Sequence, residues 1–490
     1  MPDRIARFVR RALLCVAGNE ALFLLAAFCS ASVLGMDPLA WHREATDMFA
    51  SLFVVPWGAA LCLLALERRT RMDRPGARPD LTVLFVLLAW IVVPFVVRFG
   101  ITFNTAYSAY NHLVLFFGVY ALATQEDESR FERTIDWAAT LFTGLSFALG
   151  VPAMLAVLRA TAFGTEPGGI GFGLATKMNC LSFGLHYNIT GMISVCCALF
   201  ALAGFCRRRH PLARLAHLAA FALMALCVVL SQSRTSRYAL LFACFVGCYA
   251  LASVRLPIRR LALRHAVALG CAAAVLICGY AGARALTDAA LSHYARVRSA
   301  ALHEQAAQAS QDAQTAQTAQ DDAAQETGAQ PVQDVPKVKA RAAVDPTFSA
   351  RTDIWRNLID LWKREPKRFV IGNGMGNTGS LIVEGTPLEP LGAVATHNAY
   401  LQFIADYGVI GFALLCVFLV MFVPGALRLL LSKDTRPGDR VFVMLVLSQL
   451  LTGLMESQPL GAMSPSSLAL FFSLAVIRVR GASPRGGALL

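Results

Sequence analysis

Residues 403–427 read FIADYGVIGFALLCVFLVMFVPGAL in one-letter code, and this stretch decides the fold class. The run is long enough to cross the roughly 30 Å hydrocarbon core of a bilayer as a helix. Lipid cannot satisfy exposed backbone N–H and C=O groups, so a run of this kind inside a membrane must be helical. Similar runs recur along the chain and predict an all-α integral membrane protein.

The composition supports this fold class. Of the 490 residues, 56 % are hydrophobic and only 15 % are charged, a balance that soluble globular proteins rarely have. We predict about 12 transmembrane helices, near residues 12–35, 48–66, 81–99, 107–123, 137–158, 180–204, 214–231, 237–254, 264–283, 403–427, 441–456 and 464–477.

The distribution of Lys and Arg predicts the orientation. With the N-terminus inside, the segments on the cytoplasmic side carry 26 of these residues, and the short segments outside carry 6. Because short cytoplasmic loops collect positive charge, both termini are expected in the cytoplasm. The same rule explains the net charge of +13 without a nucleic-acid partner.

The chain divides into three parts. Residues 1–283 are predicted to form transmembrane helices 1–9, and residues 401–490 form helices 10–12 and a cytoplasmic tail. Between helices 9 and 10, residues 284–400 form one large extracytoplasmic loop. Its segment 304–330 is rich in Ala and Gln and cannot bury a core, which predicts a flexible or loosely helical insertion that the chemistry does not need. The segment 349–398 is mostly helical and carries candidate site residues.

An amphipathic helix is expected in this last segment. Apolar residues recur there at spacings of three and four and predict one buried face, formed by Ile354, Trp355, Leu358, Leu361 and Trp362. All thirteen cysteines lie in or beside apolar runs, so neither a disulfide framework nor a metal site is predicted. We expect no cofactor.

The first candidate site is the turn Ser231–Arg237, between two spans on the outer side. Arg234 and Arg237 are three residues apart at a helix N-terminus, so they share a face. Free N–H groups together with two guanidinium groups suit a phosphate. The alternative is that both arginines extend to lipid headgroups.

The second candidate is Arg351, expected in the first turn of the amphipathic loop helix. An exposed surface arginine is the alternative. The run Gly372–Gly376 follows Pro366 and would suit either a phosphate-binding loop or an ordinary turn, although it lacks the Lys-Ser/Thr ending of a P-loop.

The third candidate is the pair His397-Asn398. We predict that Thr396 caps the following helix, which places His397 in its first turn. The positive end of the helix dipole disfavours an imidazolium there, and a neutral imidazole is what a general base requires. A structural histidine at the membrane interface is the alternative.

Several polar residues at the outer membrane boundary are weaker candidates. Lys177, Asn179, His186 and Asn188 lie near the outer part of the sixth span, where hydrogen bonding between helices competes with a functional role. Glu456 ends the eleventh span on the outer side and is expected to pair with one of the arginines.

These motifs stand in a fixed order. Ser233-Arg234 begins a span, and Arg351 is followed by Trp355, Pro366 and the glycine run. The loop then ends in His397-Asn398, followed by nine residues and Gly408-Val409-Ile410-Gly411. Over roughly residues 180–456 this order resembles the superfamily of O-antigen ligases and O-antigen polymerases, which are multi-pass proteins of the bacterial inner membrane.

The resemblance implies a glycosyltransferase with its active site at the periplasmic face. The donor would be a glycan on undecaprenyl diphosphate, and in a ligase the acceptor would be the lipid A-core of lipopolysaccharide. Transfer would be metal-independent and inverting, with Arg234 and Arg351 on the diphosphate and His397 as general base. Arg237, Asn398, Lys177 and His186 would contribute to substrate binding, and the surrounding membrane lipids are further partners.

Other activities remain open. An O-antigen polymerase or a protein O-oligosaccharyltransferase of the same superfamily would use a similar site. A transporter or flippase is a different class that twelve spans also suit, but such proteins commonly consist of two related halves, and the chain shows no such halves.

Overall fold

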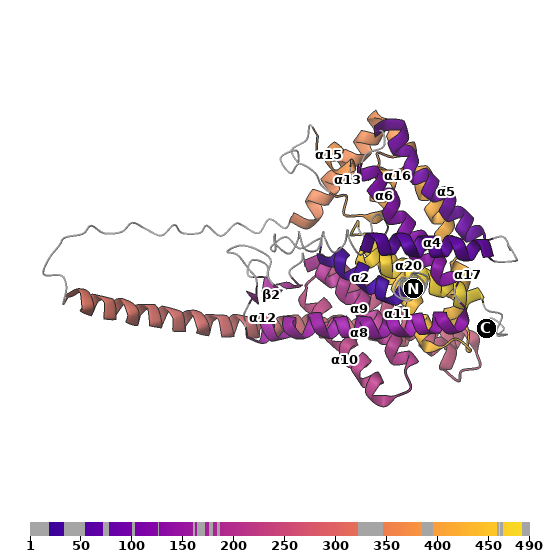
Figure 1. The fold of residues 1–490 in the computed structure, drawn as a ribbon. Helices are drawn as coiled ribbons and strands as arrows, with labels where there is room; N and C mark the ends of the chain where they lie inside the picture. The colour runs from indigo at the N-terminus through magenta and orange to yellow at the C-terminus, as the bar shows by residue number, and fades with distance from the viewer. Residues whose placement is uncertain are drawn as a thin grey trace, which may run out of the picture.

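A computed structural model describes residues 19–33, 54–71, 78–99, 103–125, 127–159, 162–163, 172–175, 180–183, 187–321, 346–375, 377–384, 395–457, 460 and 464–482. Within this part the protein is almost entirely helical (Figure 1). Eight of its helices are long and apolar enough to cross a membrane. These findings confirm the predicted class of helical membrane protein, while the number of crossings and the sidedness of the termini stay predictions.

Each predicted span contains or overlaps one or more helices. Before the first strand they are α2 (Glu20–Val33), α4 (Val55–Arg71), α5 (Pro79–Pro94), the π-helix η2 (Phe95–Phe99), α6 (Phe103–Leu113), the π-helix η3 (Val114–Ala121), α7 (Leu122–Thr124) and α8 (Glu128–Leu158). After the last strand come α9 (Tyr187–Arg207), α10 (Pro211–Leu230), α11 (Arg234–Arg255) and α12 (Leu261–Asp321). The rest are α13 (Pro346–Arg364), α14 (Pro366–Ile371), α15 (Thr378–Val383), α16 (Ala399–Val420), α17 (Val423–Leu431), α18 (Pro437–Gly453) and α20 (Pro465–Ala482).

A small antiparallel sheet departs from the all-α prediction. Its strands β1 (Ala162–Phe163), β2 (Phe172–Ala175) and β3 (Cys180–Phe183) lie in the order β1-β2-β3. Phe172 pairs with Phe183, and Ala175 pairs with Cys180. The predicted span 180–204 was therefore wrong at its start, because its first residues form β3 and the helix begins only at Tyr187. A short apolar run at the end of a span has no periodicity that separates strand from helix.

Helices α9 and α20 lie at the centre of the bundle. In each, 78 % of the most apolar window is buried inside the protein, against 17 % for α12. Phe200 of α9 stacks on Phe142 of α8, with ring centroids 4.2 Å apart. Because the outer helices expose large apolar side chains such as Leu263 and Ile277 of α12, their outward faces suit lipid rather than water.

Helix α12 is much longer than the predicted span 264–283. It continues without a break to Asp321, so the first part of the Ala/Gln-rich segment is helical. Figure 1 shows this end of α12 extending well beyond the other helices. Ala and Gln both favour helix, which explains why the helix does not stop where the apolar residues do. Residues 322–330 lie outside the described part.

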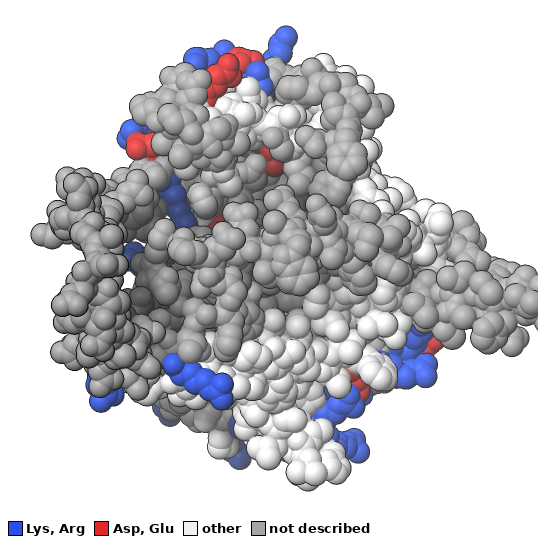
Figure 2. Space-filling model, turned by 60° about the vertical axis from the view of Figure 1, so that its left-hand side comes forward, with Lys and Arg blue, Asp and Glu red and all other residues white. Residues whose placement is uncertain are grey.

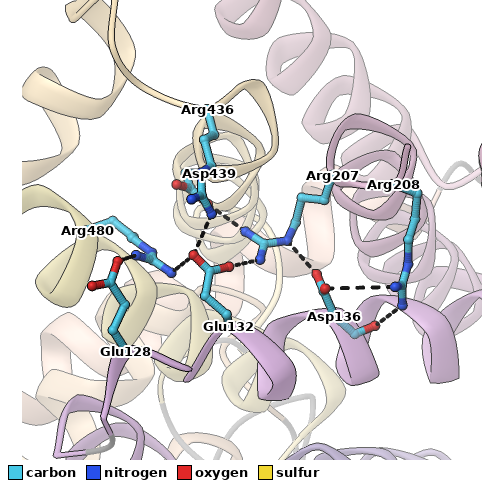
Figure 3. A network of polar contacts seen from close by, with 8 residues as sticks. All are labelled: Glu128, Glu132, Asp136, Arg207, Arg208, Arg436, Asp439 and Arg480. Atoms are coloured by element: carbon cyan, nitrogen blue, oxygen red, sulfur yellow. Dashed lines mark hydrogen bonds and ion pairs between the residues drawn. The ribbon is translucent and has the colours of Figure 1, made fainter. Parts of the chain in front are cut away.

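A network of charged side chains joins four helices at the end of the bundle where α9 stops (Figure 3). Arg207 of α9 is its centre, with its Nε 2.8 Å from Asp136 of α8 and its Nη1 2.9 Å from Asp439 of α18. Glu132 of α8 contacts both Arg207 and Arg480 of α20. Gly438 of α18 leaves room for the Arg207 side chain, because a Cβ there would lie 2.4 Å from its Cγ.

Charged side chains gather toward the two ends of the visible face in Figure 2. The charged residues of α13 and α14 lie at the top of that view, Lys and Arg are spread along the lower edge, and mostly uncharged atoms lie between them where residues are described.

Candidate functional site

The serine-rich turn before α11 fixes the position of Arg234. Ser233 caps α11, and its Oγ accepts a hydrogen bond from the Ser236 N–H at 3.3 Å. Gly191 of α9 lets this turn come close, because a Cβ at that position would lie 2.5 Å from the Ser236 Oγ. Arg234 is the first residue of α11, as the sequence predicted, and it is exposed. The turn therefore presents its guanidinium group beside the start of α9.

Helix α13 carries Arg351 in its second turn. The sequence predicted the first turn, but the helix starts earlier, at Pro346. The predicted apolar face is confirmed: Ile354 and Leu358 are buried against Ile382 and Ala405 of the neighbouring helices. This packing holds α13 against the membrane bundle, and Arg351 is only 14 % exposed.

The run beginning at Gly372 is an ordinary turn. Gly372 has φ 91° and ψ 178°, a region that only glycine adopts readily. The N–H groups of Asn373 and Gly374 donate to the carbonyls of Ala405 and Asp406, at 2.9 and 2.8 Å. Because these N–H groups are already bonded, they are not turned toward a phosphate.

The turn at Gly372 packs against the first glycine of the Gly-x-x-Gly motif. Gly408 lies inside α16 with φ 72° and ψ 173°, so the helix is kinked there. A Cβ on Gly408 would lie 2.1 Å from the Val370 carbonyl oxygen, and one on Gly372 would lie 2.4 Å from the Asp406 carbonyl oxygen. The two glycines thus allow the backbone after α14 to pack directly on the kink, where two carbonyls of α16 accept its hydrogen bonds.

His397 lies just before α16, not in its first turn. Asn398 is the N-cap residue, and its Oδ1 accepts from the N–H groups of Tyr400 and Leu401, each at 3.0 Å. The prediction that Thr396 caps the helix was wrong, because the amide side chain two positions later reaches the same free N–H groups. His397 instead has a positive φ of 51° and a side chain that is 42 % exposed.

Several hydrogen bonds hold the backbone on either side of His397. Trp355 of α13 donates its indole N–H to the Thr396 carbonyl at 2.7 Å. The Thr396 N–H donates to Gln402 Oε1 at 3.1 Å, and Gln402 donates in turn to the buried Asp406. The loop helix and α16 therefore position the imidazole together.

Glu456, just after α18, brings the separate candidates together. Its Oε1 lies 3.5 Å from Arg351 Nη2, and its Oε2 lies 4.0 Å from His397 Nδ1. The Asn188 amide of α9 donates to Glu456 Oε1 at 2.8 Å. The carboxylate is only 9 % exposed. Its predicted pairing with an arginine is confirmed, and the partner is Arg351.

Arg234 approaches the same place from α11. Its serine-rich turn packs on α9 at Gly191, about one helical turn after Asn188, which donates to Glu456, and Tyr187 begins the same helix. Residues from α9, α11, α13, the 395–398 loop and the end of α18 thus meet at one end of the bundle. We name Arg234, Arg351, His397 and Glu456 the arginine–histidine cluster.

The other residues that were expected to bind substrate lie in different surroundings. Arg237 lies one turn further along α11 and donates to the Val229 carbonyl at 3.3 Å. The Asn398 amide caps α16 and also donates to the Leu454 carbonyl at 3.0 Å, which favours a structural role over a substrate contact. Lys177 and His186 lie outside the described residues.

Two residues of this region were not singled out from the sequence. Tyr187 and Gln402 carry no local pattern that marks them, because their importance depends on helices distant in the chain. Gln232 and His397 are the non-glycine residues with positive φ in the described part of the chain. Such strained residues gather at functional sites: His397 belongs to the cluster, and Gln232 lies two residues before Arg234. A positive φ cannot be inferred from residue type alone.

The cluster consists of cations, a carboxylate and an imidazole. Two guanidinium groups neutralise phosphate charge, and a half-exposed imidazole accepts a proton from a hydroxyl group. Among the described residues, no group of three or more His, Cys, Asp or Glu is placed to hold a metal ion. The arrangement is suited to transfer from a phosphorylated donor to a hydroxyl acceptor.

Comparison with known proteins agrees with this chemistry. No curated protein matches the chain. Residues 219–416 match a family model described as O-Antigen ligase, and this stretch includes Arg234, Arg351 and His397. The match supports a glycosyltransferase-like function of the O-antigen ligase or polymerase type. Over residues 219–416 the chain is thus similar to the O-antigen ligase and polymerase superfamily.

Proposed function

We propose that the protein is an O-antigen ligase of the bacterial inner membrane. It would transfer a glycan from undecaprenyl diphosphate to the lipid A-core of lipopolysaccharide at the periplasmic face. The observation that carries the proposal is the arginine–histidine cluster, in which Arg351 and His397 share the buried carboxylate of Glu456. Donor and acceptor are both lipids of one leaflet, so they meet in two dimensions and a deep soluble pocket is not required.

The two arginines bind the donor in this proposal. Arg234 and Arg351 would hold the diphosphate and stabilise the negative charge that it gains when it leaves. The glycosidic C–O bond to the diphosphate breaks, and its electron pair stays with the departing undecaprenyl diphosphate. Because guanidinium groups form paired hydrogen bonds with phosphate oxygens, these residues are suited to the task without a metal ion.

His397 would be the general base. It takes the proton of the acceptor hydroxyl while that oxygen attacks the anomeric carbon from the opposite side, which inverts the configuration. Glu456 faces Nδ1 of the ring and would hold a proton there, leaving Nε2 to accept the new one. The separation of 4.0 Å is longer than a hydrogen bond, and such contacts commonly tighten when substrate binds.

Reconstitution tests the proposal directly. Purified protein would be mixed with undecaprenyl-diphosphate-linked glycan and lipid A-core, and transfer would be followed by gel mobility of the product. Arg234→Ala, Arg351→Ala and His397→Ala are each expected to lower the rate by about 10²-fold or more. Arg356→Ala is the matched control, because Arg356 is an exposed arginine on the same helix as Arg351.

The possible outcomes test each residue separately and distinguish a ligase from the other candidate activities. Wild-type transfer in one variant would remove that residue from the mechanism. In cells, gene deletion that removes long glycan from lipopolysaccharide while lipid-linked polymer accumulates supports a ligase. Lipopolysaccharide capped by a single repeat would indicate a polymerase, and loss of glycan from a protein alone would indicate a protein O-oligosaccharyltransferase. Transport by His397→Ala at the wild-type rate would favour a transporter.

A further inference from the structure

An apolar cavity of about 360 Å³ lies beside the arginine–histidine cluster. Its walls come from the second half of α10, the first three turns of α11 and residues 279–286 of α12. The α12 wall includes Gly282 and Leu286, which are both exposed, so the cavity opens sideways at the apolar outer surface of the bundle. We call it the lateral cavity.

The lateral cavity runs along the helices from the end that carries Arg234. Its α11 wall extends from Arg237 to Cys244, which is about 10 Å at 1.5 Å per residue. Arg237 stands in the first turn of α11, three residues after Arg234. The cavity therefore begins at the proposed phosphate-binding residues and continues toward the middle of the bundle.

Charge is confined to one end of this cavity. Arg237 is the charged residue among those that line it, and the other lining residues are apolar or small. Within the described part of the chain, the buried Arg237 Nε has no hydrogen-bond partner. A guanidinium group at an apolar wall is costly unless an anion lies near it. This pattern matches a lipid with an anionic head and an apolar chain.

We propose that the lateral cavity holds the first isoprenoid units of the donor's polyprenyl chain, with Arg237 beside the diphosphate. The inference rests on the proposed function, because it assigns the lipid part of the same donor. The chain would enter from the bilayer between α10 and α12. Its burial would fix the diphosphate beside Arg234 and make the enzyme select long-chain donors.

Two glycines of α12 provide a matched test. A Cβ at Gly282 or at Gly270 meets no atom within 4 Å, so either accepts a side chain without a clash. Gly282 lines the lateral cavity, whereas Gly270 does not. Gly282→Leu therefore fills the cavity, and Gly270→Leu makes the same chemical change on the same helix outside it.

Transfer would be measured in detergent with two donors that carry the same glycan diphosphate, one on undecaprenol and one on a single isoprenoid unit. Wild type and Gly270→Leu should use the undecaprenyl donor with a kcat/KM at least about 10-fold higher, since two buried CH₂ groups are enough for that ratio. Gly282→Leu should lose this preference through a raised KM for the long donor. Equal preference in both leucine variants would overturn the inference.

Crosslinking provides a second measurement that does not depend on turnover. A diazirine on the second isoprenoid unit of the donor should label α10, α11 or α12 in wild type and in Gly270→Leu, but not in Gly282→Leu. Labelling of these helices by a photoactivatable phospholipid that excess donor does not reduce would assign the cavity to bilayer lipid instead. The proposed function would be refuted separately, if the His397→Ala and Arg351→Ala variants transferred glycan at the wild-type rate.

Discussion

At the residue scale, His397 combines an unfavourable backbone conformation with a ring that faces Glu456 and a neighbour, Thr396, that is held by hydrogen bonds. Its φ of 51° costs on the order of 1–3 kcal/mol for a residue with a side chain. The bonds of Trp355 and Gln402 to Thr396 keep the backbone in place beside it. The conformation directs the imidazole toward Glu456 rather than along the helix that follows. The strained backbone therefore lowers the stability of the folded protein but fixes the position of the imidazole.

Glu456 gives the sharpest prediction at this scale. Glu456→Gln should lower kcat by about 10²-fold, because the neutral amide no longer orients the imidazole or supports its positive charge during transfer. The KM for the donor should stay unchanged or fall, because Arg351 loses its competing carboxylate. Steady-state kinetics of the reconstituted enzyme would check this split. Glu384→Gln, at an exposed acid, serves as the control. A rise in KM at constant kcat would contradict the positioning role.

Trp355 gives a second prediction. Trp355→Phe keeps an aromatic ring against α15 and α16 but removes the N–H that bonds the Thr396 carbonyl. Loss of one buried hydrogen bond costs about 1–3 kcal/mol, so the 395–398 loop should loosen. We expect a kcat about 10-fold lower with an unchanged unfolding temperature of the membrane bundle. An unchanged kcat would show that the other bonds alone hold His397.

At the element scale, the kink of α16 is the joint between the loop helices and the bundle. Gly408 and Gly372 both occupy glycine-only conformations, and each would bring a Cβ within 2.4 Å of a carbonyl oxygen of the other segment. Hydrogen bonds from Asn373 and Gly374 to α16 join the two backbones there. The Gly-x-x-Gly motif is thus explained by packing and not by contact with substrate.

Gly408→Ala tests this explanation. Backbone strain alone should cost about 1–3 kcal/mol, and the contact with Val370 adds to it. We expect lower thermal stability in detergent and reduced transfer, because Arg351 reaches the cluster through the docked loop helices. Gly144→Ala in α8 is the control, since a Cβ there meets nothing within 4 Å. Equal melting temperatures for the two variants would show that the glycine at position 408 is not needed for the loop helices to pack on α16.

The network around Arg207 is a second element-scale feature. The Arg207 side chain is 6 % exposed and contacts Glu132, Asp136 and Asp439. Arg207→Ala leaves three carboxylates without this cation, and removing one partner of a buried ion pair typically costs about 3–5 kcal/mol. A clearly lower unfolding temperature is expected, with donor KM unaltered in protein that remains folded. Wild-type stability would show that Arg480 and Arg436 neutralise the acids without it.

At the scale of the whole molecule, the candidate site and the charged network lie at opposite ends of α9. Tyr187 begins this helix at the arginine–histidine cluster, and Arg207 ends it in the network. Between them the helix is almost wholly buried. The candidate site therefore lies at one end of the bundle, and the ion pairs that join its helices lie at the other. The far part of α12 extends well beyond the rest of the bundle (Figure 1).

Deletion of residues 304–330 tests whether that extension matters. The deleted segment includes the last turns of α12, which lie beyond the lateral cavity, and no residue of the cluster. We expect transfer within about 2-fold of wild type, because loop length alone changes closure entropy only slightly. The reconstituted assay measures it. A folded deletion variant without activity would place acceptor recognition in this segment.

The sequence by itself determined the fold class, the position of most helices and the order of the cluster residues. Apolar length and the absence of hydrogen-bonding solvent leave helix as the local solution, so these features follow from short windows of sequence. It also predicted the buried face of α13 and the pairing of Glu456 with an arginine. The small sheet, the cap at Asn398 and the true start of α13 were predicted incorrectly, because local signals there compete within a few residues.

Only the tertiary structure decided which residues meet. Three residues from separate segments lie within 4.0 Å of the Glu456 carboxylate, namely Arg351, His397 and Asn188. No spacing along the chain indicates that they meet there. The same holds for the lateral cavity, which needs three helices to exist. The physical reason is that side-chain packing between helices far apart in the chain sets these distances, whereas periodicity reports only which face of each helix is buried.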